Sequence, residues 1–138
     1  MEHRRKLIVL VLLLALARTS LAFADEHPNA PPFLDRNQAF SMIKDNIAPD
    51  HPGLFVSDHP IQGGTEIPSW GKTLRVPANF GQAWFFFVDD QPQANWGHDC
   101  RYFFVDIQTG RFGVVSALTP PDNWSRMEKF QHPPKNFN

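Results

Sequence analysis

Hydrophobic and polar positions follow three successive patterns along the chain. The first is an unbroken apolar run at residues 7–17, preceded by basic residues at 4–6 and followed by the small-x-small sequence Ala22-Phe23-Ala24. That order is typical of a secretory signal peptide. The run is also shorter than the ~20 residues that a membrane-spanning helix needs. We therefore predict a signal peptide at residues 1–24 and a periplasmic or secreted mature protein with no membrane anchor.

The second pattern is a helical periodicity at residues 34–47. Its apolar positions recur every three to four residues and form one stripe, made of Ala39, Phe40, Ile43 and Ile47. Asp35 is suited to cap the first turn. The segment 48–53 contains two prolines, which lack a backbone N–H, so we expect the helix to end there.

The third pattern is typical of strands and continues to residue 117. The predicted strands are residues 54–56, 72–76, 83–88, 102–107 and 112–117. The runs at 83–88 and 102–107 are almost continuously apolar, which favours central strands covered on both faces, one by the helix and the other by a loop or a partner. Gly110 lies in a tight turn between the last two strands, where a positive φ is needed. We expect residues 60–68 to be a turn-rich connection, because Gly63-Gly64 lies between flexible segments.

Together these elements predict an α+β fold, with one N-terminal helix packed on a curled antiparallel sheet of four to five strands. The predicted organisation is a signal peptide at 1–24, a proline-rich leader at 25–33, a single domain at 34–131 and a loose tail at 132–138.

Charge argues against two classes of partner. The whole chain has 13 Lys and Arg and 14 Asp and Glu. Cleavage after residue 24 removes four basic residues and one acidic residue, which leaves 9 against 13 and a net charge of −4. An acidic domain gains nothing from counterion release on a polyanion. We therefore predict no nucleic-acid partner and no anionic membrane surface.

Three tryptophans in polar turns are the candidate partner-binding residues. Trp70, Trp96 and Trp124 are each flanked by Gly, Asn, Pro or Asp. A tryptophan in such a turn either folds back over the sheet edge or is presented to a ligand, and tryptophan is over-represented in interaction surfaces. We add His98 and Asp99, beside Trp96, to the predicted surface. The tryptophan rings are also suited to stacking on sugars.

Cys100 is the only cysteine, so no internal disulfide is available. Its simplest role is a small apolar core residue. His98, two residues earlier, would share its face of a regular strand, and this pair is an alternative ligand set for zinc or copper. Asp89, Asp90 and Asp99 would add oxygen ligands, and His51 and His59 in the earlier loops could converge on the same site. The same pair leaves open a cysteine-dependent hydrolase, although no catalytic motif surrounds it. We predict no catalytic residue and no cofactor.

The hairpin at residues 101–112 carries a family resemblance. Its sequence Val105-Asp106-Ile107-Gln108-Thr109-Gly110 resembles the strand–turn–strand signature of PepSY-like modules, and the preceding helix fits their layout. The order of helix and sheet is also similar to the cystatin fold, but the Gln-x-Val-x-Gly hairpin of cystatins is absent. The PepSY resemblance implies an exported module that acts as an inhibitor, chaperone, prosegment or binding unit.

The sequence thus predicts an exported, non-enzymatic domain that binds a protein partner, in the manner of an inhibitor or prosegment. The alternative is a small periplasmic metal-binding or redox-linked protein that uses His98 and Cys100.

Overall fold

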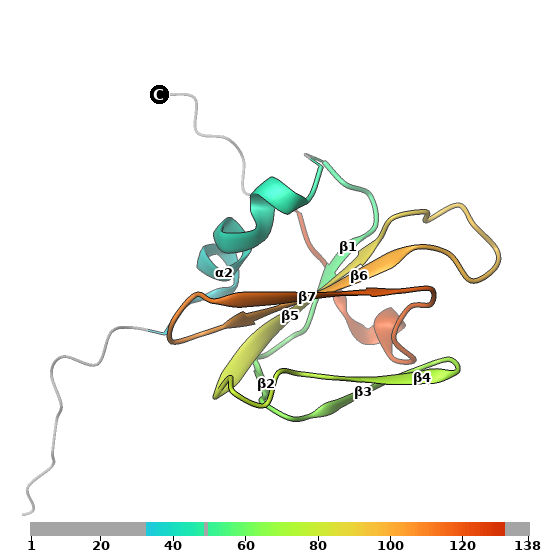
Figure 1. The fold of residues 1–138 in the computed structure, drawn as a ribbon. Coiled ribbons are helices and arrows are strands. Elements are labelled where there is room, and N and C mark those ends of the chain that lie inside the picture. The colour runs from blue at the N-terminus through green and yellow to red at the C-terminus, as the bar shows by residue number, and fades with distance from the viewer. Residues whose placement is uncertain (1–32, 49, 132–138) are drawn as a thin grey trace, which may run out of the picture. The chain divides into compact units, whose positions relative to one another are not determined.

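The two densest apolar runs of the chain pair with each other at the centre of a sheet. The computed structural model describes residues 33–48 and 50–131 (Figure 1). Strands β5 (Gln82–Asp89) and β6 (Cys100–Asp106) are antiparallel, with Ala83 opposite Asp106 at one end and Asp89 opposite Cys100 at the other. This is the six-stranded sheet of the described residues, in the order β7-β6-β5-β1-β8 with β2 also paired to β5.

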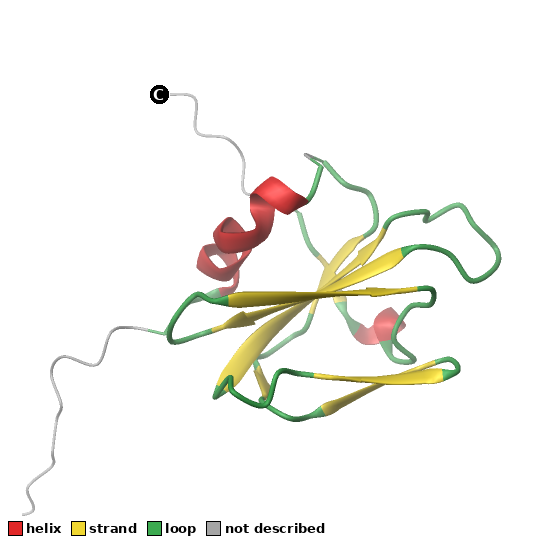
Figure 2. Ribbon diagram, in the orientation of Figure 1, coloured by secondary structure: helices red, strands yellow, loops and turns green. Residues whose placement is uncertain are grey.

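The other strands of this sheet are shorter and lie at its sides. They are β1 (Leu54–Val56), β2 (Ile61–Gln62), β7 (Phe112–Ala117) and β8 (Glu128–Lys129). A separate antiparallel pair consists of β3 (Glu66–Ser69) and β4 (Lys72–Arg75). Figure 2 shows that strands make up much more of the domain than helices do.

Alternation along β5 and β6 explains why their runs are apolar at every position. Successive side chains on a strand point to opposite faces. Phe86 and Phe103 therefore belong to one buried cluster, together with the helix, while Phe85 and Phe104 belong to a second cluster that also contains Leu74 of β4. Both faces of the central strands are thus covered. The helix covers part of one face, and the β3–β4 pair, in place of a loop or a partner, covers the other (Figure 1).

The helix and the β6–β7 turn form where their sequences indicate. Helix α2 (Arg36–Ile43) begins with a capping box in which Asp35 accepts from Gln38 N–H and the Gln38 side chain accepts from Asp35 N–H. It continues into the 3-10 turn η1 (Lys44–Asn46). In the turn after β6, Gly110 has a φ of 69°, and the Asp106 carboxylate accepts from the Thr109 backbone at 2.8 Å.

The predicted fold class is wrong. Strands account for 38% and helices for 14% of the interpretable residues, so the domain is mostly sheet. The main sheet has six strands where four to five were expected, and the β3–β4 pair is an additional sheet. The helix is a short element and does not form a layer comparable in size to the sheet.

Weak local signals explain this error. Residues 61–69 contain Gly63-Gly64 and Pro68, which indicated a turn-rich connection. The segment instead contains β2 and β3, and Pro68 is tolerated because β3 pairs with only one neighbour. β8 follows the 3-10 turn η2 (Trp124–Arg126) and is too short to show a period of its own.

The predictions for the signal peptide, most of the leader and the tail fall on residues 1–32 and 132–138, which lie outside the described residues. Within the described residues, no helix is long and apolar enough to cross a membrane.

Candidate functional site

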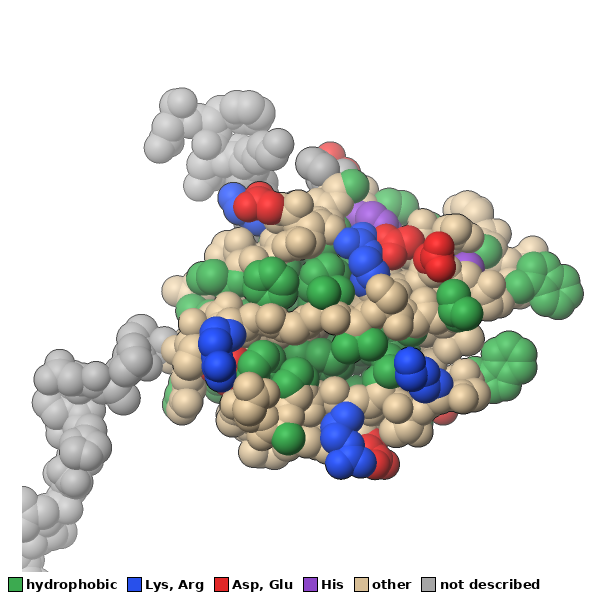
Figure 3. Space-filling model, in the orientation of Figure 1, with side chains coloured by type: hydrophobic (Ala, Val, Ile, Leu, Met, Phe, Trp, Pro, Cys, Tyr) green, Lys and Arg blue, Asp and Glu red, His purple; other side chains and the backbone are tan. Residues whose placement is uncertain are grey.

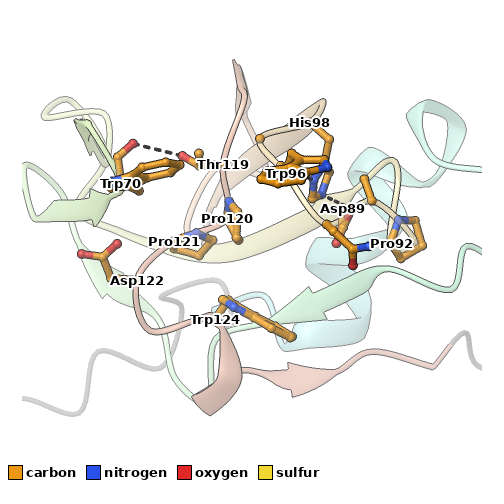
Figure 4. Close-up of a pocket in the computed structure, with 13 residues that line it drawn as sticks. Trp70, Asp89, Pro92, Trp96, His98, Thr119, Pro120, Pro121, Asp122 and Trp124 are labelled. Atoms are coloured by element: carbon orange, nitrogen blue, oxygen red, sulfur yellow. Dashed lines mark hydrogen bonds and ion pairs between the residues drawn. The ribbon is translucent and has the colours of Figure 1, made fainter.

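Three segments that are far apart in the sequence meet at one cavity of about 640 Å³ (Figure 4). They are the β3–β4 turn, the loop between β5 and β6, and the segment from β7 to η2. The cavity is within the ~300–1,000 Å³ range of small-ligand pockets. Its lining residues are Trp70, Asp89, Pro92, Ala94, Asn95, Trp96, Gly97, His98, Thr119, Pro120, Pro121, Asp122 and Trp124. We call this cavity the tryptophan pocket.

Each of the three segments contributes one tryptophan to this pocket. Trp70 is 80% exposed and Trp96 is 85% exposed, so neither ring is folded back into a core. Trp124 is 42% exposed and packs edge-on against Phe55, with ring centroids 5.5 Å apart. Large apolar side chains project from the side of the molecule where the β5–β6 loop and the β3–β4 turn end (Figure 3).

Hydrogen bonds between the segments hold the pocket walls together. The Ser69 hydroxyl lies 2.5 Å from the Thr119 hydroxyl and donates to the Pro120 carbonyl at 3.0 Å. The buried Tyr102 hydroxyl donates to the Thr119 carbonyl at 3.0 Å. The pocket therefore rests on the sheet itself, so its walls are largely pre-formed.

The β5–β6 loop is tied to the same wall by its backbone. His98 N–H donates to the Leu118 carbonyl at 2.8 Å. A Cβ atom at Gly97 would lie 3.1 Å from that carbonyl oxygen, which is closer than ordinary contact, so glycine permits this approach. Trp96 consequently extends from a loop whose next residues are anchored.

His98 has a hydrogen-bond acceptor on each side of its ring. Nδ1 lies 2.6 Å from the Trp96 carbonyl oxygen, and Nε2 lies 2.8 Å from Asp89 Oδ1 (Figure 4). The hydrogen bond to the Trp96 carbonyl raises the pKa of His98; partial burial opposes the rise, and the negative charge of Asp89 adds to it. Two acceptors favour the doubly protonated imidazolium ring.

Cys100 lies beside this pair but inside the second core cluster. Its side chain is 1% exposed, and Sγ donates to the His98 carbonyl at 3.4 Å. Burial, followed by the negative charges of Asp89, Asp90 and Asp99, raises the pKa of the Cys100 thiol to about 12. A buried, protonated thiol is a poor nucleophile. A carboxylate oxygen of Asp89, a His98 ring nitrogen and Cys100 Sγ nevertheless lie within 4.8 Å of one another.

The structure brings together four of the five residues that the sequence indicated for partner binding. Trp70, Trp96, His98 and Trp124 all line the tryptophan pocket, whereas Asp99 does not and has an exposed side chain. The partner-binding set predicted from the sequence did not include the lining residues Asp89, Pro92, Thr119, Pro120, Pro121 and Asp122. Pro120-Pro121, which follows the last strand of the sequence prediction after two intervening residues, was the available signal for a rigid wall.

No protein-family model, no curated protein and no solved structure matches this chain. The resemblance of the residue 101–112 hairpin to PepSY-like modules, and of the element order to cystatins, therefore stays a prediction from the sequence.

Proposed function

We propose that this protein is an exported, non-enzymatic binding domain, and that its tryptophan pocket holds an extended segment of a protein partner. The observation that carries the proposal is the convergence of Trp70, Trp96 and Trp124, from three separate segments, on one pocket with two of the rings mostly exposed. Soluble domains seldom leave such apolar area in water without a use.

The chemistry of the lining favours an extended peptide that combines apolar or proline residues with a basic one. Aromatic-lined grooves bind proline-rich segments in the polyproline II conformation. Asp122 lines the pocket with an exposed side chain and has no ion pair among the described residues. A Lys or Arg of the partner would pair with this carboxylate or lie over an exposed tryptophan ring. The acidic balance of the processed chain also favours a basic segment.

Selection from a displayed random-peptide library tests the proposal. The wild-type protein should enrich peptides that contain proline or aromatic residues beside Lys or Arg, and a Trp70→Ala/Trp96→Ala double variant should not enrich them. Phe33→Ala is the matched control, because it removes an aromatic ring that is 60% exposed but does not line the pocket.

The control variant should select the same peptides as the wild type. If the wild type enriches no peptide, or if the double variant enriches the same set, the proposal is wrong. A panel of immobilised glycans serves as the second arm, since tryptophan rings also stack on sugars. Glycan binding that is lost in the double variant, without peptide binding, would assign the pocket to sugars instead.

A further inference from the structure

We propose that Asp89, His98 and Cys100 form a zinc-binding site at the wall of the tryptophan pocket. This goes beyond partner binding, and it selects Asp89 from the three carboxylates that the sequence offered beside the His98–Cys100 pair. The ligand atoms of these residues lie within 4.8 Å of one another.

Strand register creates this cluster. Asp89 is the last residue of β5 and Cys100 the first of β6, and the two are direct partners in the antiparallel ladder. His98 lies two residues before Cys100, in the loop whose backbone is held to Leu118. The cluster thus rests on the two central strands of the sheet, which gives its ligands fixed positions.

The donor set favours zinc over other common ions. One sulfur, one imidazole nitrogen and one carboxylate oxygen are all ligands that zinc accepts in tetrahedral sites. Calcium and magnesium prefer oxygen ligands alone, and copper(I) prefers softer sets without a carboxylate. Three protein ligands leave a fourth position free, as in zinc sites that bind water or another molecule.

The distance between the His98 and Asp89 ligand atoms requires only a small adjustment. Zinc bond lengths of ~2.0–2.3 Å place neighbouring tetrahedral ligand atoms about 3.3–3.6 Å apart. His98 Nε2 and Asp89 Oδ1 are now 2.8 Å apart, because a hydrogen bond joins them. Their separation would widen by about half an ångström. Binding would also release two protons to the solvent, one from the Cys100 thiol and one from His98 Nε2, which faces Asp89 Oδ1 at 2.8 Å in the metal-free protein.

The orientation of His98 is an independent observation that fits a ligand. Its Nδ1 faces the Trp96 carbonyl oxygen at 2.6 Å, so Nε2 is the nitrogen directed toward Asp89. Metal-binding histidines commonly donate their second ring N–H to a backbone carbonyl or carboxylate, which fixes the ring. Asp89 and His98 both line the tryptophan pocket, so an ion would reach them from that cavity.

Isothermal titration of the purified processed protein with zinc chloride tests the proposal. The wild type should bind one equivalent, and His98→Gln and Asp89→Asn should each bind more than about tenfold more weakly. His59→Gln is the matched control: His59 is an exposed histidine 2.5 Å from Asp58, with no cysteine nearby, and its loss should leave zinc affinity unchanged.

Cobalt(II) provides a readout specific to sulfur. A thiolate–cobalt charge-transfer band should appear in the wild type and be absent in Cys100→Ser, and circular dichroism would verify that this variant folds. The proposal is overturned if the folded wild type binds no stoichiometric zinc, or if His98→Gln and Asp89→Asn bind it as tightly as the wild type. Because zinc titration needs no peptide, a failure here is separate from a failure of the proposed partner binding.

Discussion

Replacing Trp96 with alanine should separate binding from stability. A tryptophan side chain buries about 150–250 Å² when it is fully covered. Trp96 is 85% exposed, so the folded domain covers only about 25–40 Å² of it, worth less than about 1 kcal/mol at ~25 cal/mol per Å². If a partner covers half of the exposed part, the contact is worth about 2 kcal/mol, or roughly a thirtyfold change in Kd.

Trp84 is the comparison for this prediction. It is half-buried, packs against the cluster beneath α2 and donates from its ring N–H to the Leu34 carbonyl at 2.9 Å. Trp84→Ala should therefore cost about 2–4 kcal/mol of unfolding free energy. In a domain of this size that lowers Tm by roughly 10 °C or more, against less than about 5 °C for Trp96→Ala.

The assay is thermal unfolding of both variants, followed by calorimetric titration with a peptide selected by the wild type. Trp96→Ala should lose affinity with little change in Tm, and Trp84→Ala should lose Tm and keep its affinity below its unfolding temperature. The reasoning is refuted if Trp96→Ala lowers Tm as much as Trp84→Ala does, because the ring would then be part of the core. An unchanged Kd in Trp96→Ala would equally refute it.

Three further predictions concern stability and reactivity. Burial raises the pKa of Asp106, but its hydrogen bonds from Thr109 and Gln108 outweigh burial and hold that pKa below its ordinary value. The ionised carboxylate therefore stabilises the folded state at pH values above the unfolded-state pKa of ~3.9, and this contribution is lost as pH falls through the folded-state pKa. Chemical denaturation at stepped pH should show this acid-linked loss of unfolding free energy in the wild type and not in Asp106→Asn. Gly110→Ala should cost about 1–2 kcal/mol in the same unfolding assay, because φ there is 69°, and a cost near zero would mean that the turn relaxes. In the absence of metal, Cys100 should react with iodoacetamide near neutral pH only after unfolding, because its thiol is buried and its pKa is raised to about 12. Mass spectrometry follows the labelling, and rapid labelling of the folded protein would contradict this prediction.

The sequence predicted the strongest local elements because their signals are contained in a few neighbouring residues. The Phe-rich runs became β5 and β6, the capped apolar stripe became α2, and Gly110 adopts the positive φ that its turn needs. The sheet as a whole was mispredicted because β2, β3 and β8 are short and are held by pairing with other strands. Such pairing leaves no recognisable hydrophobic periodicity in the sequence of a short strand.

The candidate site was likewise only partly predictable from the sequence. Trp70, Trp96 and Trp124 stood out because large rings beside turn residues are unusual, but their convergence depends on contacts between distant segments. Ser69 meets Thr119 across fifty residues of sequence, for example. The pairing of Asp89 with Cys100 likewise depends on the register of two strands, which the continuous apolar runs do not specify.

The unbroken apolar sequence of β5 and β6 affects how these two strands align during folding. A strand with one apolar face loses its burial when it slips by one residue, and this penalty normally selects the correct alignment. Phe85, Phe86 and Phe87 present rings to both faces of β5, so a slipped pairing would remain well buried. Selection must then come from polar contacts at the strand ends, where Arg101 donates to both carboxylate oxygens of Asp90 at 2.8 and 2.6 Å. We expect removal of this ion pair to increase the population of slipped pairings of β5 with β6 during refolding.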